Sequence, residues 1–77
     1  MSIRIRYFAS LRDRLERDAD QLEVDEPLAV GEVWQRLNPD LPLPPQTLAA
    51  LNHEYAGLDA PVRDGDELAF FPPVTGG

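Results

Sequence analysis

The sequence contains no cysteine and no lysine among its 77 residues. Without cysteine, the chain cannot form disulfides, supply a thiolate nucleophile or build a cysteine zinc cluster. All seven basic residues are arginine. No side-chain ammonium of this sequence can therefore accept an isopeptide bond.

The sequence also lacks any long apolar run. No stretch approaches the roughly 20 apolar residues of a membrane span, and the first 18 residues lack the apolar core of a secretory signal. We therefore expect a cytoplasmic protein. Fourteen acidic residues give a formal charge of −7, which opposes nonspecific binding to nucleic acid or to an anionic membrane. We expect neither as a partner, and favour proteins with basic surfaces or pockets.

Length and composition predict one small domain over residues 1–77. The hydrophobic share is 43%, which is typical of a globular chain despite eight prolines. A chain of this size buries about 60% of the surface that its unfolded form exposes. A second domain does not fit.

Two segments near the N-terminus alternate between apolar and polar residues, as strands do. Residues 2–8 predict a strand with a buried face and a solvated face. The buried face would carry Ile3, Ile5 and Tyr7, and the solvated face Arg4, Arg6 and Phe8. Residues 20–26 predict a second strand. The charged residues between them predict a short helical turn, with Ser10 as its candidate N-cap.

The spacing of apolar residues from Val30 to Leu37 is that of one helical face, and it includes Trp34 as a core residue. Asn38 and Pro39 should end this helix, because proline cannot extend its hydrogen-bond ladder. The following "PDLPLPPQ" has four prolines in eight residues and predicts a stiff, irregular connection.

The last third of the chain predicts several short strands. Residues 47–59 predict a strand, a tight turn near Asn52–His53 and a short return strand. Residues 63–71 predict a turn at Asp64–Gly65 and a final strand. Without alternating strand–helix–strand units, this order favours an α+β fold with one main helix packed on one face of a mixed sheet.

No residue cluster indicates catalysis or metal binding. His53, the only histidine, is interpreted as a turn residue. The acidic residues Asp64, Asp66 and Glu67 lack the loop length and ligand spacing of a calcium site. No phosphate loop or nucleophile motif is present. We expect no metal, no bound cofactor and no catalysis by the chain alone.

Three phenylalanines lie at strand ends. Phe70 and Phe71 are adjacent, so they cannot both enter the core. Either of them can be the buried one. Phe8 shares its face with two arginines and should be exposed. Large aromatic side chains on an uncovered sheet face are candidate contacts for a partner protein.

The sequence ends in "FFPPVTGG". Together with "IRIRYFASLRDRL" at the start and "LAALNHEYAGLDAPVRDGDELAFFPPVTGG" over the last thirty residues, this ending resembles the MoaD family of ubiquitin-like sulfur carriers, the small subunits of molybdopterin synthase. The resemblance covers nearly the whole chain. It implies a β-grasp (ubiquitin-like) fold with a flexible Gly-Gly tail at residues 72–77.

The resemblance also implies a chemistry for the tail. An ATP-dependent activating enzyme would adenylate the carboxylate of Gly77, and a sulfur donor protein would convert it to a thiocarboxylate. The tail would then enter a pocket of the large subunit and deliver sulfur to cyclic pyranopterin monophosphate, forming the dithiolene of molybdopterin. The complex would be a heterotetramer. The carrier would be its non-catalytic subunit.

Roles for single residues follow from the resemblance. Gly76 and Gly77 have no side chains that would obstruct a narrow channel. Val74 and Thr75 are small enough to line it, and Pro72 and Pro73 hold the exit extended. An apolar interface patch would comprise Phe8, Tyr55 and Phe71. For Tyr55, ordinary packing on the sheet is an equal alternative.

Other functions stay open. The Gly-Gly ending is compatible with a frayed terminus, with a sulfur carrier for the thiazole of thiamine, or with a ubiquitin-like protein modifier. A modifier would form an isopeptide bond between its glycine carboxylate and a target lysine. The context "FFPPVTGG" favours the pterin pathway.

Overall fold

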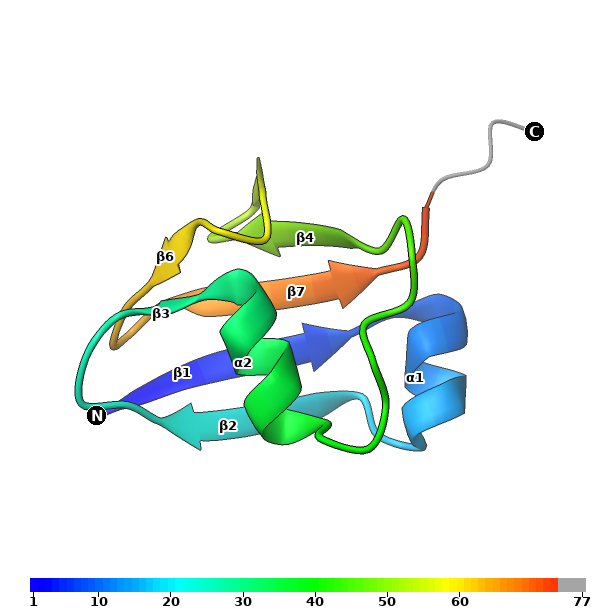
Figure 1. The fold of residues 1–77 in the computed structure, drawn as a ribbon, viewed down its shortest axis with the longest axis horizontal. Coiled ribbons are helices and arrows are strands. Elements are labelled where there is room, and N and C mark those ends of the chain that lie inside the picture. The colour runs from blue at the N-terminus through cyan, green and yellow to red at the C-terminus, as the bar shows by residue number, and fades with distance from the viewer. Residues whose placement is uncertain (74–77) are drawn as a thin grey trace.

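The computed structural model describes residues 1–73. They form a five-stranded sheet with one helix across a face and another at one end (Figure 1). The elements in chain order are β1 (Ser2–Tyr7), α1 (Ala9–Leu15), β2 (Ala19–Glu23), β3 (Leu28–Ala29), α2 (Val30–Leu37), β4 (Leu48–Leu51), β5 (Glu54–Ala56), β6 (Pro61–Val62) and β7 (Glu67–Phe71).

The strand order in the large sheet is β2-β1-β7-β4-β5. The two central strands, β1 and β7, run parallel, and every other neighbouring pair is antiparallel. β3 and β6 form a separate two-stranded sheet. The predicted α+β class with a mixed sheet is confirmed.

The alternation in β1 produces the two predicted faces. Ile3, Ile5 and Tyr7 are buried, whereas Arg4 and Arg6 are exposed. The buried face is covered by α2, whose core residues are Val30, Val33 and Trp34. Within residues 1–73 no helix covers the opposite face of the sheet, which is called the open face below.

An aromatic cluster fills the space between α2 and the two central strands. The ring of Phe70 lies 5.1 Å from that of Trp34 and 6.2 Å from that of Tyr7, and Tyr7 and Trp34 meet edge to face at 6.0 Å. Such pairs stabilise a fold beyond the burial of their area. Because Phe70 is the buried member of its pair, Phe71 lies on the open face.

The hydroxyl of Tyr7 belongs to a partly buried polar network. It donates to Asp20 Oδ2 at 3.0 Å and accepts from Asn38 Nδ2 at 3.4 Å. The guanidinium of Arg17 bonds both Asp20 and Asn38 and lies 5.5 Å from the Tyr7 ring centroid. Burial raises the pKa of the Tyr7 phenol above its ordinary value of 10.0. The network joins β1, the start of β2 and the end of α2.

Two tight turns have the chemistry that their sequences predict. Asn52 and His53 connect β4 to β5, and both have positive φ angles (50° and 72°), as the two-residue turns that match strand twist require. At the second turn Gly65 has a φ of 87°. Its N–H donates to Ser2 O at 2.8 Å, which fixes the start of β1 beside β7.

The helical turn predicted after β1 is a helix, but its proposed cap is wrong. α1 begins at Ala9, with Phe8 as the N-cap residue and no side-chain hydrogen bond. Ser10 lies inside the first turn because the chain continues extended through Phe8, whose N–H donates to Phe70 O at 3.1 Å. Pairing with β7 thus keeps Phe8 extended, and the helix begins directly after it, so Ser10 is already inside the helix.

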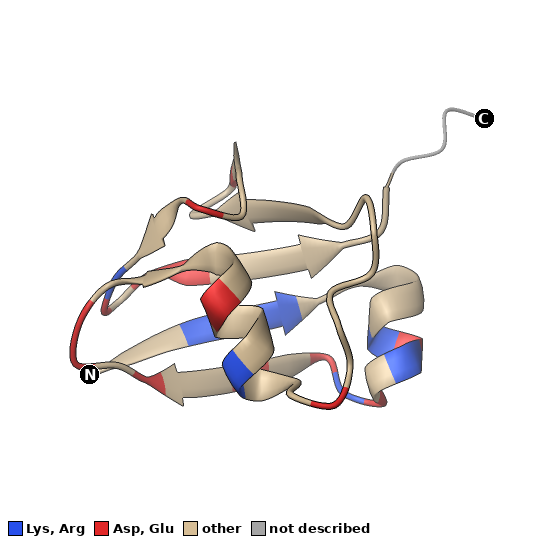
Figure 2. Cartoon of the chain, viewed as in Figure 1, with Lys and Arg blue, Asp and Glu red and all other residues tan. Residues whose placement is uncertain are grey.

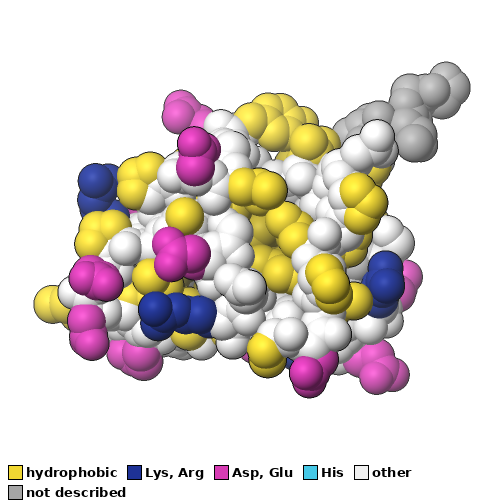
Figure 3. Space-filling model, in the orientation of Figure 1, with side chains coloured by type: hydrophobic (Ala, Val, Ile, Leu, Met, Phe, Trp, Pro, Cys, Tyr) yellow, Lys and Arg dark blue, Asp and Glu magenta, His cyan; other side chains and the backbone are white. Residues whose placement is uncertain are grey.

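The proline-rich segment after α2 packs beside that helix. The indole N–H of Trp34 donates to Leu41 O at 2.8 Å, and Asn38 ends the helix as predicted. A hollow of about 370 Å³ remains between α2, this segment and Leu58. Apolar side chains gather there in Figure 3.

Replacement of Tyr7 by Phe tests the polar network. Removing the hydroxyl should lower the free energy of unfolding by about 1 kcal/mol at neutral pH. The folded state favours the neutral phenol, so the stability of the wild type should fall as pH rises above 10, where the unfolded state loses this proton. Tyr7→Phe should remove that part of the slope in denaturant titrations. Tyr55→Phe, an exposed control, should keep it, and equal slopes for all three proteins would contradict the assignment.

Candidate functional site

The described chain leaves the sheet at Pro72 and Pro73, directly after β7. Because β1 and β7 are parallel, β1 ends at the same end of the sheet as β7, and α1 packs beside this end (Figure 1). The predicted tail residues Val74, Thr75, Gly76 and Gly77 lie outside the described residues. The site that can be built is therefore the surface around the tail's point of departure.

Phe8 and Phe71 lie on the open face, where the two central strands end. Tyr7 pairs with Phe70 across the two central strands, and both side chains are buried. The next residue of each strand therefore points to the opposite face. Phe8 is 40% exposed and Phe71 is half-buried. The exposure predicted for Phe8 is confirmed, and of the two adjacent phenylalanines Phe71 is the one on the open face.

Tyr55 joins Phe71 across β4. The two rings lie 5.8 Å apart at a tilt of 50°, although Tyr55 is 74% exposed. The strand β4 lies between them in the sheet, with Leu48 opposite Phe71 and Ala50 opposite Tyr55. Leu48 and Ala50 therefore lie on the same face of the sheet as the two rings.

We define the apolar patch as the apolar open-face residues of β7, β4 and β5 together with Phe8; the charged open-face residue of β7, Glu67, is not a member. Its members are Phe8, Leu48, Ala50, Tyr55, Ala69 and Phe71. The sequence prediction missed Leu48, Ala50 and Ala69. Their strands were predicted, but the side of the sheet that each residue occupies follows from the pairing register, which the sequence pattern does not supply.

The patch has a chemistry suited to recognition. Its side chains carry no charge, and the only polar atom among them is the Tyr55 hydroxyl. Exposed aromatic residues beside aliphatic ones are typical of the centre of a protein interface. Rigid strands hold the patch, so few side chains lose freedom when a partner covers it.

The other candidates from the sequence behave as structural residues. Trp34 is core, as predicted. His53 lies in its turn, with its Nε2 3.7 Å from Glu67 Oε1. Asp64 Oδ1 accepts from Ser2 N at 2.7 Å, and Asp66 Oδ2 accepts from Arg63 N at 2.8 Å. These carboxylates stabilise the turn before β7.

Residues 1–73 contain no cluster of three or more histidine, aspartate or glutamate side chains that could hold a metal ion. Within the same range, no helix is both long enough and apolar enough to cross a bilayer. What the described residues of the site offer is a docking surface where the chain leaves the sheet.

The chain is similar to known proteins along its full length. The model of the ThiS family matches residues 5–77. Two curated proteins named "Molybdopterin synthase sulfur carrier subunit", from Escherichia coli and Haemophilus influenzae, are 37% and 39% identical, with 97% of this chain and 99% of each relative covered.

A solved structure shows the same fold. SAMP1 from Haloferax volcanii has a TM-score of 0.81 and 29% identity, and the match covers 100% of both chains. Similarity to proteins of this kind confirms the predicted ubiquitin-like β-grasp fold.

Truncation of Tyr55 separates a recognition role from a structural one. Since the side chain is mostly exposed, Tyr55→Ala should change the free energy of unfolding by no more than about 0.5–1 kcal/mol, measured by urea titration. Phe70→Ala, its buried counterpart, should cost about 3–5 kcal/mol. A similarly large loss for Tyr55→Ala would show that this residue serves the fold.

Proposed function

The chain belongs to the ThiS family, and from this premise we propose that it is the sulfur carrier subunit of a molybdopterin synthase. The observation that carries the proposal is the near full-length similarity to two curated sulfur carrier subunits. The geometry supports it, because the apolar patch includes Phe71, the last residue of β7 before the tail.

The reacting group in this proposal is the carboxylate of Gly77. A carboxylate is a poor electrophile because its charge is delocalised, so an ATP-dependent activating enzyme first joins it to AMP and releases pyrophosphate. Sulfur from a donor protein then displaces AMP and leaves a thiocarboxylate. Two such carriers each pass one sulfur to cyclic pyranopterin monophosphate, forming the two-sulfur dithiolene of molybdopterin, and each returns to the Gly77 carboxylate. ATP is bound by the activating enzyme, and this chain holds no cofactor.

The tail and the patch divide the work between them. Pro72 and Pro73 fix φ at the base of the tail, which reduces the chain entropy lost when it enters a pocket; each ordered residue costs roughly 1–2 kcal/mol. Val74, Thr75 and Gly76 enter the channel. Phe8, Phe71 and Tyr55 contact the large subunit, which supplies the active site and a basic pocket for the anionic end.

The proposed assembly contains two carriers and two large subunits, a heterotetramer located in the cytoplasm. The curated relatives are named as subunits, which implies a larger complex for them. The carrier itself is the sulfur donor and not the catalyst.

Two rivals make different predictions for the same chain end. A carrier for thiamine thiazole synthesis would form the same thiocarboxylate but deliver it to another acceptor. A ubiquitin-like modifier would appear attached to lysines of other proteins. The match to SAMP1 concerns the fold, so the outcome at the carboxylate has to be measured.

The first test is intact-mass analysis of the protein incubated with its activating enzyme, ATP and a sulfur donor. We expect replacement of one oxygen by sulfur, located at Gly77 by fragmentation. Deletion of Gly77 should abolish sulfur transfer while leaving the melting temperature nearly unchanged. Conjugates with target lysines would favour a modifier, and a large loss of stability would assign the tail a structural role.

The second test distinguishes the pathways and examines the patch. Thiocarboxylated protein mixed with the large subunit and cyclic pyranopterin monophosphate should yield molybdopterin, whereas a thiazole synthase should yield no product. Phe71→Ala should weaken binding to the large subunit by about 2 kcal/mol or more, because it removes an aromatic residue from the centre of the interface. The exposed Leu58→Ala, outside the patch, is the control. Equal affinities for both variants would contradict the docking role.

A further inference from the structure

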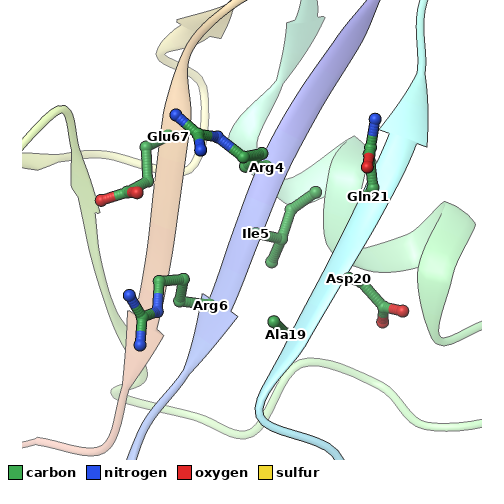
Figure 4. Close-up of a pocket in the computed structure, with 7 residues that line it drawn as sticks. All are labelled: Arg4, Ile5, Arg6, Ala19, Asp20, Gln21 and Glu67. Atoms are coloured by element: carbon green, nitrogen blue, oxygen red, sulfur yellow. The ribbon is translucent and has the colours of Figure 1, made fainter.

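The open face has a second half that the apolar patch does not include. On β1, next to β7, Arg4 and Arg6 project from this face (Figure 4). They border a hollow of about 360 Å³ whose far side is formed by Ala19, Asp20 and Gln21 of β2. We call Arg4 and Arg6 the arginine pair.

The arginine pair has no acidic partner among residues 1–73. The ion pairs formed there involve the amino group of Met1, Arg17 and His53. Two glutamates, Glu23 and Glu67, lie on the open face, and Glu67 is the cross-strand neighbour of Arg4 without forming an ion pair with it. Glu23 lies 3.2 Å from the Met1 amino group, and Glu67 lies 3.7 Å from His53. Neither guanidinium of the arginine pair is therefore held in an ion pair by a described residue, on a chain whose formal charge is −7.

The sheet holds Arg6 ready for a contact. Its neighbours across the two adjacent strands are Ala19 and Ala69, and both are too small to cover its guanidinium. The guanidinium lies 5.6 Å from the ring centroid of Phe8, within the range of a cation–π interaction. A planar guanidinium positioned in this way can donate two parallel hydrogen bonds to a carboxylate with little loss of side-chain freedom.

The arginine pair is continuous with the apolar patch. Phe8 touches Arg6 on one side and stands at the end of the sheet beside β7 on the other. A protein that covers Phe8, Phe71 and Tyr55 would also extend over β1. Most other charges on the molecule are acidic and lie in loops and at strand ends (Figure 2).

From these observations we infer that the arginine pair binds carboxylates on the large subunit, adjacent to the apolar contact. The inference rests on the proposed function, which supplies that subunit. Residues two apart on a strand face are separated by about 7 Å, so the partner should present two acidic side chains at a similar spacing. The large subunit would then carry an acidic rim beside its basic tail pocket.

The test measures association of the full chain with the large subunit by biolayer interferometry at several salt concentrations. Reversal of both charges, Arg4→Glu with Arg6→Glu, should slow association about tenfold or more at low salt and flatten its salt dependence. Position 4 lies opposite Glu67 on the neighbouring strand, so a glutamate there would repel Glu67 within the protein. A neutral double variant, Arg4→Gln with Arg6→Gln, is therefore measured as well. It should show the same direction with a smaller effect and an unchanged melting temperature.

A matched control separates local contact from net charge. Arg36 is exposed on α2, on the other side of the sheet. Two exposed arginines, Arg36 and Arg63 in the turn before β7, changed together to Glu alter the net charge by the same amount as the double reversal. This control should bind at nearly the wild-type rate. Equal slowing in both double variants would contradict a specific site, as would an unchanged rate in the Arg4 and Arg6 variant.

Failure of this inference differs from failure of the carrier proposal. With thiocarboxylated protein at saturating large subunit, the charge-reversed variant should still transfer sulfur, but half-saturation should need about tenfold more partner. If wild-type protein transferred no sulfur, the carrier proposal would fail first. Charge-dependent self-association of the wild type in gel filtration would instead assign this face to a second copy and overturn the inference.

Discussion

The arrangement of this protein depends on the parallel pairing of its first and last strands. The pairing places Tyr7 beside Phe70 in the core and lets Trp34 close the aromatic cluster from the helix side. It also brings the end of β1 and the start of the tail to the same end of the sheet. Because side chains alternate along a strand, burying Tyr7 and Phe70 leaves Phe8 and Phe71 on the open face.

The two faces of the sheet therefore contribute to different properties, stability and partner binding. The covered face contains the core and the polar network around Tyr7, and its residues determine stability. The open face carries the apolar patch and the arginine pair on rigid strands, and in our proposal its residues determine which partner binds. A change on the open face can alter recognition with a small effect on folding.

Local patterns predicted much of this structure. The alternation of residues 2–8, the helix ending at Asn38 and the turns at Asn52–His53 and Asp64–Gly65 depend on neighbouring residues, and all were confirmed. The N-cap of α1 was wrong because pairing of Phe8 with β7 is a distant interaction. Leu48, Ala50 and Ala69 were missed for a similar reason. Their positions beside Phe71 and Tyr55 depend on register between strands far apart in the sequence.

The central claim is that the open face, and not the helix side, docks the partner beside the tail. The most direct measurement is NMR mapping of backbone amide shifts in labelled protein while unlabelled large subunit is added. We expect the strongest perturbations at Phe8, Phe71, Leu48 and Tyr55, extending to Arg4 and Arg6, with α2 unaffected. Perturbations centred on α2 and the proline-rich segment, with β1 and β7 unchanged, would contradict the account.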